Sequence, residues 1–452
     1  MDLDRHIHLD YTLYDLYSLD DGCASNIVLV LYLPTQCNSR GTSQGRFIYG
    51  SWDVHSHDQD HTLLENILLQ LRYGYMTGPI PLIFPSFRSH DDNDPGPNLD
   101  NLYNFEAFEK LRVDQRPVCK IARSPDDIML PPDCRITVLV PTDSLLHLPH
   151  TIHPDVHYDL LSKRGLALSN LSMPKTAIID PAWSPDVSLK DGVSLDAEIE
   201  RILTLIDSHR LPFVLKMSQT FAGLGVLKLC KEEDRSAART RLRSWLQLVL
   251  RWITPSNQHL QPCSLILQEF IQGSAVSLSL FVTRKGRAFF VACCDQLFDA
   301  DGQWAGGKIS YKKQPALEKE YSEISANIAR FLHEKGYHGP AGADVMTDEF
   351  GNQYVVDLNV RLTGTHNLGP LRGHFTQRGL WEAMAMKCNF RRSQEAFERD
   401  FDTELRNGSM IIMGWVRNET KDHGCVGFTL GGEDPSSLQE LSQKIRNYAA
   451  LD

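Results

Sequence analysis

The second half of the chain alternates helical stripes with short apolar runs. Apolar residues recur there at intervals of three and four positions, the spacing that places them on one face of a helix. Three such stripes begin at Leu195, Leu242 and Tyr321. Ser194 precedes the first stripe as a predicted helix cap, and Pro255 stops the second. We assign all three stripes to the hydrophobic core and expect no chemistry from them.

Short apolar runs between the stripes predict four strands, namely Phe213–Lys216, Leu265–Phe270, Ser277–Val282 and Phe289–Cys294. In roughly the first 150 residues, apolar runs at Ile27–Leu33 and Ile136–Val140 alternate with helical patterns such as Leu63–Leu71. This alternation indicates a small open α/β domain. Two segments rich in turn-forming residues, Thr35–Arg46 and Arg88–Asn101, predict long loops within it.

Length and composition bound the class of protein. The 452 residues suffice for about three domains, and 42% apolar with 23% charged residues is typical of a globular protein with a sizeable core. No apolar run approaches the ~20 residues of a membrane-spanning helix, and the acidic N-terminus lacks the pattern of a secretory signal. Ten cysteines without CxxC pairs indicate reduced thiols, and a net charge of −11 disfavours nucleic-acid binding. We therefore predict a cytoplasmic protein without nucleic-acid or membrane partners.

The stretch ADVMTDEFGNQYVVDLNVR, residues 343–361, predicts two strands joined by a turn. A four-residue loop at 349–352 would put Asp348 opposite Gln353 and, further along, Asp344 opposite Asp357. Two carboxylates directly opposite one another, with Cβ atoms ~5 Å apart, repel. A divalent cation such as Mg²⁺ removes that repulsion, and it prefers oxygen ligands of this kind, shared with substrate phosphates. The alternative is a solvated hairpin edge.

The second strand of this hairpin has two different faces. Side chains alternate along a strand, so Asp357, Asn359 and Arg361 share one face. The other face carries three apolar residues that we assign to the core, Val356, Leu358 and Val360. A polar face beside an apolar one, with a second Asp opposite, favours the metal site over the solvated edge.

A second candidate is the segment LPFVLKMSQTFAGLGVLKL, residues 211–229. A strand ends on Lys216, and the loop that follows contains Ser218, Gly223 and Gly225. Backbone amides of such a loop bind phosphate oxygens, its glycines allow a close approach, and the lysine supplies a point charge. It is not a P-loop, because GxxxxGK[ST] is absent and a strand follows the loop. On its own this pattern is also that of an ordinary hairpin turn.

Two weaker signals complete the set. In LILQEFIQG, residues 265–273, an apolar strand offers backbone hydrogen bonds and an apolar wall to a flat adenine ring. By itself this segment is only a strand with a turn. Lys163, in the sequence LLSKRGLAL, is a further candidate cation, although an isolated lysine is more often solvated.

The order and spacing of these signals resemble the ATP-grasp superfamily. Lys163, Lys216 with its loop, the segment 268–271 and the acidic hairpin follow one another as in that superfamily, over about residues 160–373. The hairpin looks like the magnesium-binding hairpin of D-alanine–D-alanine ligases, and residues 359–364 look like the NxRxTG variant of other ATP-grasp ligases. Phrases such as GPAGADVM and FDADGQWAGGKISY are similar to filamentous-fungal proteins described as solid-state-culture-specific ATP-grasp proteins.

The resemblance implies an α/β (α+β) chain with the ATP-grasp fold in three parts. Residues 1–155 would form an open α/β domain that precedes the ATP-grasp region. Residues 156–272 would form the central lid subdomain with its flexible glycine-containing loop. Residues 273–452 would form an antiparallel-sheet subdomain that carries the magnesium site.

The resemblance also implies a role for each candidate residue. Those implied to bind ATP are Lys163, Lys216, Ser218, Gly223, Gly225, Gln268, Glu269 and Ile271, with Ser218–Gly225 closing over the phosphates. Those implied to ligate Mg²⁺ are Asp344, Asp357 and Asn359. Lys216 and Arg361 are the implied catalytic residues, and Arg361 would face the transferred phosphoryl group. The acidic residue that usually holds the ribose is missing from Gly273–Val276, and Ser274 or Ser277 is the candidate to replace it.

The activity implied by the resemblance is ATP-dependent ligation of a carboxylate to an amine through an acyl phosphate, with release of ADP and phosphate, in fungal specialised metabolism. One of the two small-molecule substrates would be an amino acid, and the resemblance allows a homodimer. A catalytically degenerate ATP-binding sensor or scaffold is the alternative, which the missing ribose acid favours. A phosphotransferase or carboxylase would need a phosphohistidine or biotin partner region, and the sequence contains no sign of either.

Overall fold

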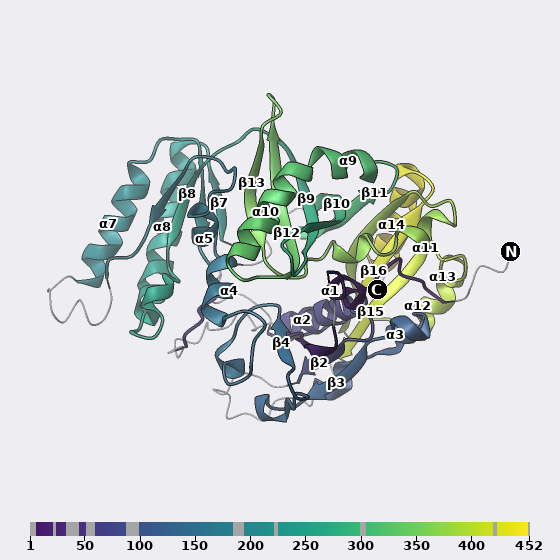
Figure 1. Cartoon of the computed structure of the whole chain (residues 1–452). Helices are drawn as coiled ribbons and strands as arrows, with labels where there is room; N and C mark the ends of the chain where they lie inside the picture. Colours follow the sequence, from purple (N-terminus) through teal and green to yellow (C-terminus); the bar gives the residue numbers. More distant parts are fainter. Residues whose placement is uncertain are drawn as a thin grey trace.

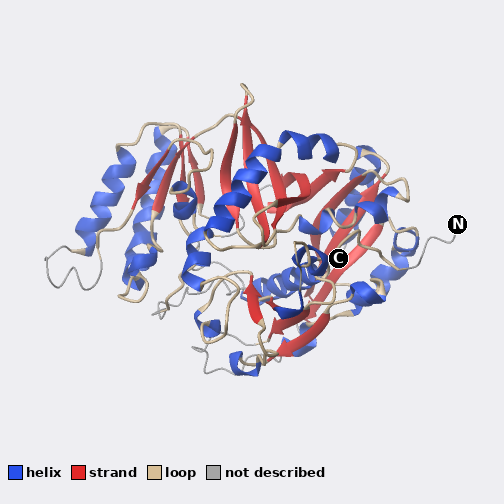
Figure 2. Cartoon of the chain, viewed as in Figure 1, coloured by secondary structure: helices blue, strands red, loops and turns tan. Residues whose placement is uncertain are grey.

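The structure is a computed structural model that describes residues 6–20, 24–32, 45–50, 59–86, 99–183, 194–220, 225–298, 304–418 and 423–450. Its strands form three separate sheets (Figures 1 and 2). In Figure 1 the smaller central sheet lies at the left, the large C-terminal sheet fills the middle and right, and the N-terminal sheet lies below.

The N-terminal sheet has four parallel strands in the order β3-β2-β1-β4. They are β1 (Ile27–Val30), β2 (Pro81–Pro85), β3 (Val118–Ala122) and β4 (Arg135–Val138). The accompanying helices are α1 (Leu13–Tyr17), α2 (Gln59–Gly74) and α3 (Glu106–Glu109). All four residues of β1 are buried, as in parallel strands covered on both faces. The predicted open α/β arrangement is confirmed, while most of the two predicted long loops lies outside the described residues.

The central sheet is antiparallel, in the order β5-β8-β6-β7. Its strands are β5 (Thr176–Ile179), β6 (Phe213–Met217), β7 (Val226–Leu229) and β8 (Leu265–Glu269). Helices α4 (Pro154–Leu160) and α5 (Lys163–Ala167) precede it, and α7 (Leu195–Asp207) and α8 (Glu232–Val249) pack on one of its faces. Two of the predicted stripes are these last two helices, and the Ser194 side chain accepts a hydrogen bond from the Ala197 amide as predicted for a cap.

The C-terminal sheet has eight antiparallel strands in the order β13-β12-β9-β10-β11-β14-β16-β15. They are β9 (Gly273–Val282), β10 (Ala288–Phe298), β11 (Trp304–Ser310), β12 (Gly339–Asp348), β13 (Gln353–Asn359), β14 (Glu382–Phe390), β15 (Met410–Asn418) and β16 (His423–Gly432). The helices of this region are α9 (Gln314–Glu320), α10 (Ser322–Glu334), α11 (Arg372–Thr376), α12 (Gln394–Asp400), α13 (Asp402–Arg406) and α14 (Pro435–Ala450). One face of the sheet packs against α10 and, further along, against α14.

The opposite face of the C-terminal sheet packs against the N-terminal domain. Leu68 and Leu71 of α2 lie over Gly414 of β15, where a Cβ atom would come within 2.9 Å of Leu71. These leucines belong to one continuous apolar core that runs from β1 and β2 through α2 into β10, β14, β15 and β16. The central sheet has a core of its own, to which Ile48 is the single contributor from outside residues 156–272 among the described residues.

We propose residues 1–155, 156–272 and 273–452 as the three domains, because each range contains one of the three sheets. In the described ranges no helix combines the length and apolar character needed to cross a membrane. The eight cysteines that the structure describes are all free, which agrees with the prediction of reduced thiols.

Candidate functional site

Asp344 of β12 faces Asp357 of β13 in the antiparallel ladder, as predicted. The turn, however, differs from the prediction: Thr347, and not Asp348, is opposite Gln353. The turn is thus one residue longer than expected, which by itself would shift the pairing of the whole hairpin. A β-bulge between Asp344 and Val345 restores the register, and Val356 is its extra residue.

The bulge also changes which side chains enter the core. Val355 and Leu358 are buried against α10, together with Val360 just beyond the strand. The prediction that Val356 belongs to the core is wrong, because this residue is only partly buried. A bulge places two residues opposite one and interrupts the alternation of faces on which that prediction relied.

Asp344 lies in surroundings that favour its protonated form. Burial raises the pKa of its carboxyl group to about 6, and the neighbouring Asp357 carboxylate acts in the same direction. The Nε2 atom of Gln296 on β10 donates a hydrogen bond of 2.6 Å to Asp344 Oδ1. Ser277 faces Asp344 from β9 and also bonds to it. Gln296 was not predicted, and Ser277 was predicted for the ribose instead.

Asp357 lies in surroundings of opposite character. Burial raises the pKa of its carboxyl group, but the ammonium groups of Lys163 and Lys216 more than offset this and hold the pKa below its usual value. Lys163, at the start of α5, forms a salt bridge to Asp357 with an Nζ to Oδ1 distance of 3.1 Å. The structure therefore brings both predicted lysines to the predicted metal-binding hairpin.

Lys216 reaches the hairpin from the central sheet. Its Nζ atom donates a 2.5 Å hydrogen bond to the carbonyl oxygen of Val356, the extra residue of the bulge. Only 6% of Lys216 is exposed, and this burial lowers the pKa of its ammonium group to about 8 despite the nearby Asp357. A desolvated ammonium group beside carboxylates is well placed to donate hydrogen bonds to phosphate oxygens.

Asn359 and Arg361 continue the polar face of the hairpin. The Asn359 amide lies 3.5 Å from Asp357 Oδ2 and accepts a 3.3 Å hydrogen bond from the Arg361 guanidinium. That guanidinium also donates to the hydroxyl of Tyr73, at the C-terminal end of α2, over 3.4 Å. Sequence patterns gave no indication of Tyr73, because it lies in an apolar helical segment far along the chain.

The predicted phosphate loop is partly described. Lys163 donates through its amide to the Ser218 carbonyl at 2.9 Å and through Nζ to the Thr220 carbonyl at 3.2 Å. Gly225 has φ +85°, and a Cβ atom there would meet Thr220 at 2.6 Å, so only glycine fits. Gly223 lies outside the described residues.

The face of the central sheet that bears Lys216 also bears Gln268. Lys216 pairs with Ile266, and Gln268 pairs with Val214, so all four side chains share that face. Phe213 and Leu267 point to the opposite side, towards the helices α7 and α8. Gln268 is 3% exposed and donates a 3.4 Å hydrogen bond to Thr176. Four apolar side chains line the same face beside the lysine: Ile178, Val214, Val226 and Ile266. These residues were not predicted, although alternation along the strands could have found them.

Three other residues predicted for the nucleotide lie less deeply. Glu269 shares the register position of Phe213, so its exposed side chain leaves the face of Gln268, while its amide bonds to the Lys175 carbonyl at 2.8 Å. Ile271 is partly buried, and Ser274 is exposed opposite Thr347, near the hairpin turn. At Glu269 only the backbone lies on the side of the nucleotide. The predicted roles of Glu269, Ile271 and Ser274 stay predictions.

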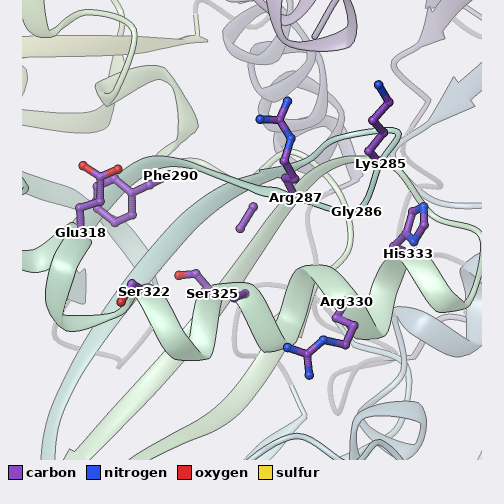
Figure 3. Close-up of a pocket in the computed structure, with 11 residues that line it drawn as sticks. Lys285, Gly286, Arg287, Phe290, Glu318, Ser322, Ser325, Arg330 and His333 are labelled. Atoms are coloured by element: carbon purple, nitrogen blue, oxygen red, sulfur yellow. The ribbon is translucent and has the colours of Figure 1, made fainter. Parts of the chain in front are cut away.

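A separate cavity of about 490 Å³ lies on the other face of the C-terminal sheet, beside α10 (Figure 3). Figure 3 shows Ser322, Ser325 and Arg330 along α10 below Arg287, and the guanidinium groups of the two arginines point to opposite sides. Arg287 is paired with Asp20, so its charge is already balanced. Asp344 projects from the opposite face of the sheet, and this cavity is therefore not part of the site.

In the described ranges, no group of three or more His, Cys, Asp or Glu side chains could by itself hold a metal ion. The hairpin offers two carboxylates and one amide. Mg²⁺ commonly uses one or two protein carboxylates and completes its shell with water and substrate phosphates. The donor set therefore fits a metal that is bound together with a nucleotide.

Comparisons with known proteins agree with this architecture. Residues 195–359 match the family model described as L-aspartate--L-methionine ligase, ATP grasp. The structure of N5-carboxyaminoimidazole ribonucleotide synthetase in complex with ADP is similar at a TM-score of 0.50, with 10% identity over 84% of this chain and 93% of that one. The chain has the ATP-grasp fold.

A second similar structure is N5-carboxyaminoimidazole synthase from Aspergillus clavatus with ADP and 5-aminoimidazole ribonucleotide. Its TM-score is 0.50 and its identity 9%, over 94% of this chain and 99% of that one. No curated protein sequence matches the chain. The predicted fold is confirmed, and residues 195–359 are similar to the model of an ATP-grasp ligase family. This range contains Lys216, Gln268, Asp344 and the bulge at Val356.

Proposed function

We propose that the protein is an ATP-dependent carboxylate–amine ligase that forms an amide or peptide bond and releases ADP and phosphate. The observation that carries the proposal is the meeting of Lys163 and Lys216 with Asp357 and its bulge. The two lysines come from the central region and the acidic group from the C-terminal sheet, so cations and oxygen ligands converge from both sides of one site.

ATP is the proposed nucleotide. Its phosphates would replace the Val356 carbonyl and the Asp357 carboxylate as partners of Lys216 and Lys163, with Ser218 and Gly225 framing the loop above them. The apolar face around Gln268 supports the base, which prefers a flat apolar wall. Ser274, exposed opposite Thr347 near the hairpin turn, stays the proposed neutral donor to the ribose.

Mg²⁺ is the proposed metal, held by Asp344, Asp357 and Asn359. The raised pKa of the Asp344 carboxyl, caused by burial and by Asp357, supports a bound cation, because the charge of Lys216 does not offset these two effects. When bound, the ion would supply charge neutralisation to phosphate oxygens.

The proposed reaction has two steps. The substrate carboxylate attacks the γ-phosphorus of ATP, which breaks the bond to the bridging oxygen and gives an acyl phosphate and ADP. The amine then attacks the acyl carbon, loses a proton and expels phosphate. Lys216 and Arg361 would hold the transferring oxygens, since Lys216 reaches the bulge from the central sheet and Arg361 ends the polar face of the hairpin.

An ATP-binding sensor or scaffold is the second candidate. It is favoured by the missing ribose acid, because the segment Gly273–Val276 contains no carboxylate. A sensor would bind ATP and Mg²⁺ without a steady release of ADP that depends on an acid and an amine.

A mass-spectrometric screen of acid and amine pairs with ATP and Mg²⁺ tests the activity. We expect ADP and an amide product, a hydroxamate when hydroxylamine replaces the amine, and transfer of ¹⁸O from the labelled acid to phosphate. Label in AMP would contradict the mechanism, and nucleotide binding without turnover for any pair would favour the sensor. A role in fungal specialised metabolism, cytoplasmic location and a homodimer stay predictions.

A further inference from the structure

Arg72 lies in the last turn of α2 and is almost completely buried, with 4% of its surface exposed. Its hydrogen bond runs from NH2 to the Gly364 carbonyl over 3.3 Å. No carboxylate among the described residues pairs with it. A buried guanidinium ordinarily has an anionic partner, because the loss of hydration is otherwise uncompensated.

The fold provides a fitted slot for this side chain. Gly427 of β16 lies beneath it, where a Cβ atom would come within 2.7 Å of Arg72 Cδ. The Trp304 ring lies 5.9 Å from the guanidinium carbon and rests on Gly364, where a Cβ atom would come within 2.3 Å of the ring. Two glycines and one aromatic ring thus hold the guanidinium in position without neutralising it.

A second cation on the same surface has a different environment. Lys387 of β14 faces Gly427 in the ladder and forms a salt bridge with Glu65, two turns before Arg72 on α2. The helix therefore supplies a carboxylate to one cation and none to the other. Burial lowers the pKa of Arg72, with Tyr73 opposing the shift, which agrees with a charge that the described residues leave without a carboxylate partner.

Arg72 is close to the proposed reaction centre. Gly364, which accepts its hydrogen bond, follows Arg361 by three residues, and Tyr73 contacts the Arg361 guanidinium at 3.4 Å. The end of α2 thus reaches the segment 361–364 through two successive side chains. An anion held by Arg72 would lie beside the transferring group but apart from the lysines.

We propose that Arg72 binds a carboxylate of a substrate that does not take part in bond formation. This inference rests on the proposed ligase function and narrows its substrates to those with an additional carboxylate. Two sources share this chemistry: the α-carboxylate of an amino acid that serves as the amine, or the second carboxylate of a diacid that serves as the acid.

The test measures binding and needs no turnover. The full-length protein with Mg²⁺ and ADP is titrated with the twenty common amino acids and succinate, and with L-methioninamide and succinamate as neutralised partners of L-methionine and succinate. Thermal shift and calorimetry give the affinities. We expect at least one carboxylate to bind the wild type about tenfold to a hundredfold more tightly than Arg72→Met. The affinity lost on replacing L-methionine by L-methioninamide is compared with the affinity lost on replacing succinate by succinamate. A larger loss in the first pair identifies the amine substrate as the source of the carboxylate, and a larger loss in the second pair identifies the acid substrate.

Controls separate binding from folding. Arg72→Met is expected to melt at or above the temperature of the wild type without ligand, because an uncompensated charge is removed. Arg72→Lys keeps a charge and should recover part of the affinity, and Lys387→Met should leave carboxylate binding unchanged. Equal carboxylate affinity in the wild type and both Arg72 variants would overturn the proposal, whereas failure of the ligase function would appear separately as an absence of ADP formation with every pair.

Discussion

The C-terminal sheet meets the N-terminal domain and the four-stranded central sheet through interfaces of different chemistry. Towards the N-terminal domain it shares one continuous apolar core, in which Leu71 of α2 lies on β15. Helices α4 and α5 also share an apolar core with β12, β13 and α10, and Lys163 of α5 forms the salt bridge to Asp357. The central sheet itself reaches the hairpin through the polar contact of Lys216 with the Val356 carbonyl. The central sheet keeps a core of its own.

The shared apolar core holds two parts of the molecule together, whereas the polar contacts of the lysines are contacts that a bound ligand can replace. An apolar interface of core quality joins two parts into one body, whereas polar interfaces between domains permit relative motion. The polar contacts are also the ones for which phosphates would compete. We therefore expect the N-terminal domain and the C-terminal sheet to act as one block, against which the central sheet with α7 and α8 closes on ATP.

Asp357→Asn should give the largest effect, because Asp357 belongs both to the polar interface and to the proposed metal site. Loss of the carboxylate leaves Lys163 and Lys216 without their shared anion, which should cost about 3 kcal/mol of unfolding free energy. Turnover should fall about a thousandfold. Denaturant melts and ADP release measure the two losses, and an unchanged stability would contradict the assigned ion pair.

Leu71→Ala should destabilise the fold by about 3 kcal/mol, because it opens a cavity in the shared apolar core. The ATP affinity of the folded fraction should stay that of the wild type. Urea unfolding and calorimetric ATP titration check both statements. A clear loss of ATP affinity together with stability would mean that the apolar and the polar interface are coupled and do not act independently.

Lys216→Met should weaken ATP binding by about 2–3 kcal/mol through loss of a charge-assisted hydrogen bond. Because the pKa of Lys216 is about 8, the wild-type affinity should decline as the pH rises above 8 and the ammonium group loses its proton. The Met variant should lack that decline. ATP titrations from pH 7 to 9.5 provide the measurement, with Lys319→Met at an exposed position of α9 as the control.

Asp344→Asn should have the smallest effect, and one of opposite sign. The pKa of Asp344 is raised from 3.8 to about 6 in the folded protein, so the folded state binds this proton more tightly than the unfolded state does. Stability is therefore lost as the pH rises from about 4 to about 6. Above pH 6, without metal, the Asn variant should be more stable by on the order of 2 kcal/mol.

The difference between Asp344→Asn and the wild type should vanish near pH 4. Chemical denaturation in the presence of a chelator at both pH values measures it. Adding Mg²⁺ and nucleotide should stabilise the wild type more than the variant, and a variant that is less stable at every pH would show that Asp344 has a purely structural role.

Alternation and spacing were enough to predict the opposed carboxylates and the open α/β arrangement. The facing of Asp344 and Asp357 was predicted from a regular hairpin with a four-residue turn, and it holds because the bulge compensates for a turn that is one residue longer. The bulge at Val356 could not be predicted, because both turn lengths allow this pairing and the bulge depends on tertiary contacts such as that of Lys216.

Residues that reach the site from elsewhere in the chain were missed for a related reason. Arg72 and Tyr73 lie in a helix whose pattern indicates only a buried apolar face, and Gln296 lies in an ordinary strand. The one local signal at Arg72 is a single cation inside the apolar run of α2, and its meaning depends on the glycines of β16 and the segment after β13, which are hundreds of residues away.

The extra residue of the bulge has a consequence for mutational scanning. Val345 faces Val355 and Asp344 faces Asp357, so a gene lacking only codon 356 would encode a regular hairpin in which every other pair is kept. The protein would lose one main-chain oxygen, the acceptor of Lys216. Every amino acid carries that same oxygen, so replacing Val356 leaves it in place. The contact with Lys216 requires a residue at position 356 but hardly depends on which residue it is. Deleting position 356 should therefore have a clear effect, whereas substitutions there should have little.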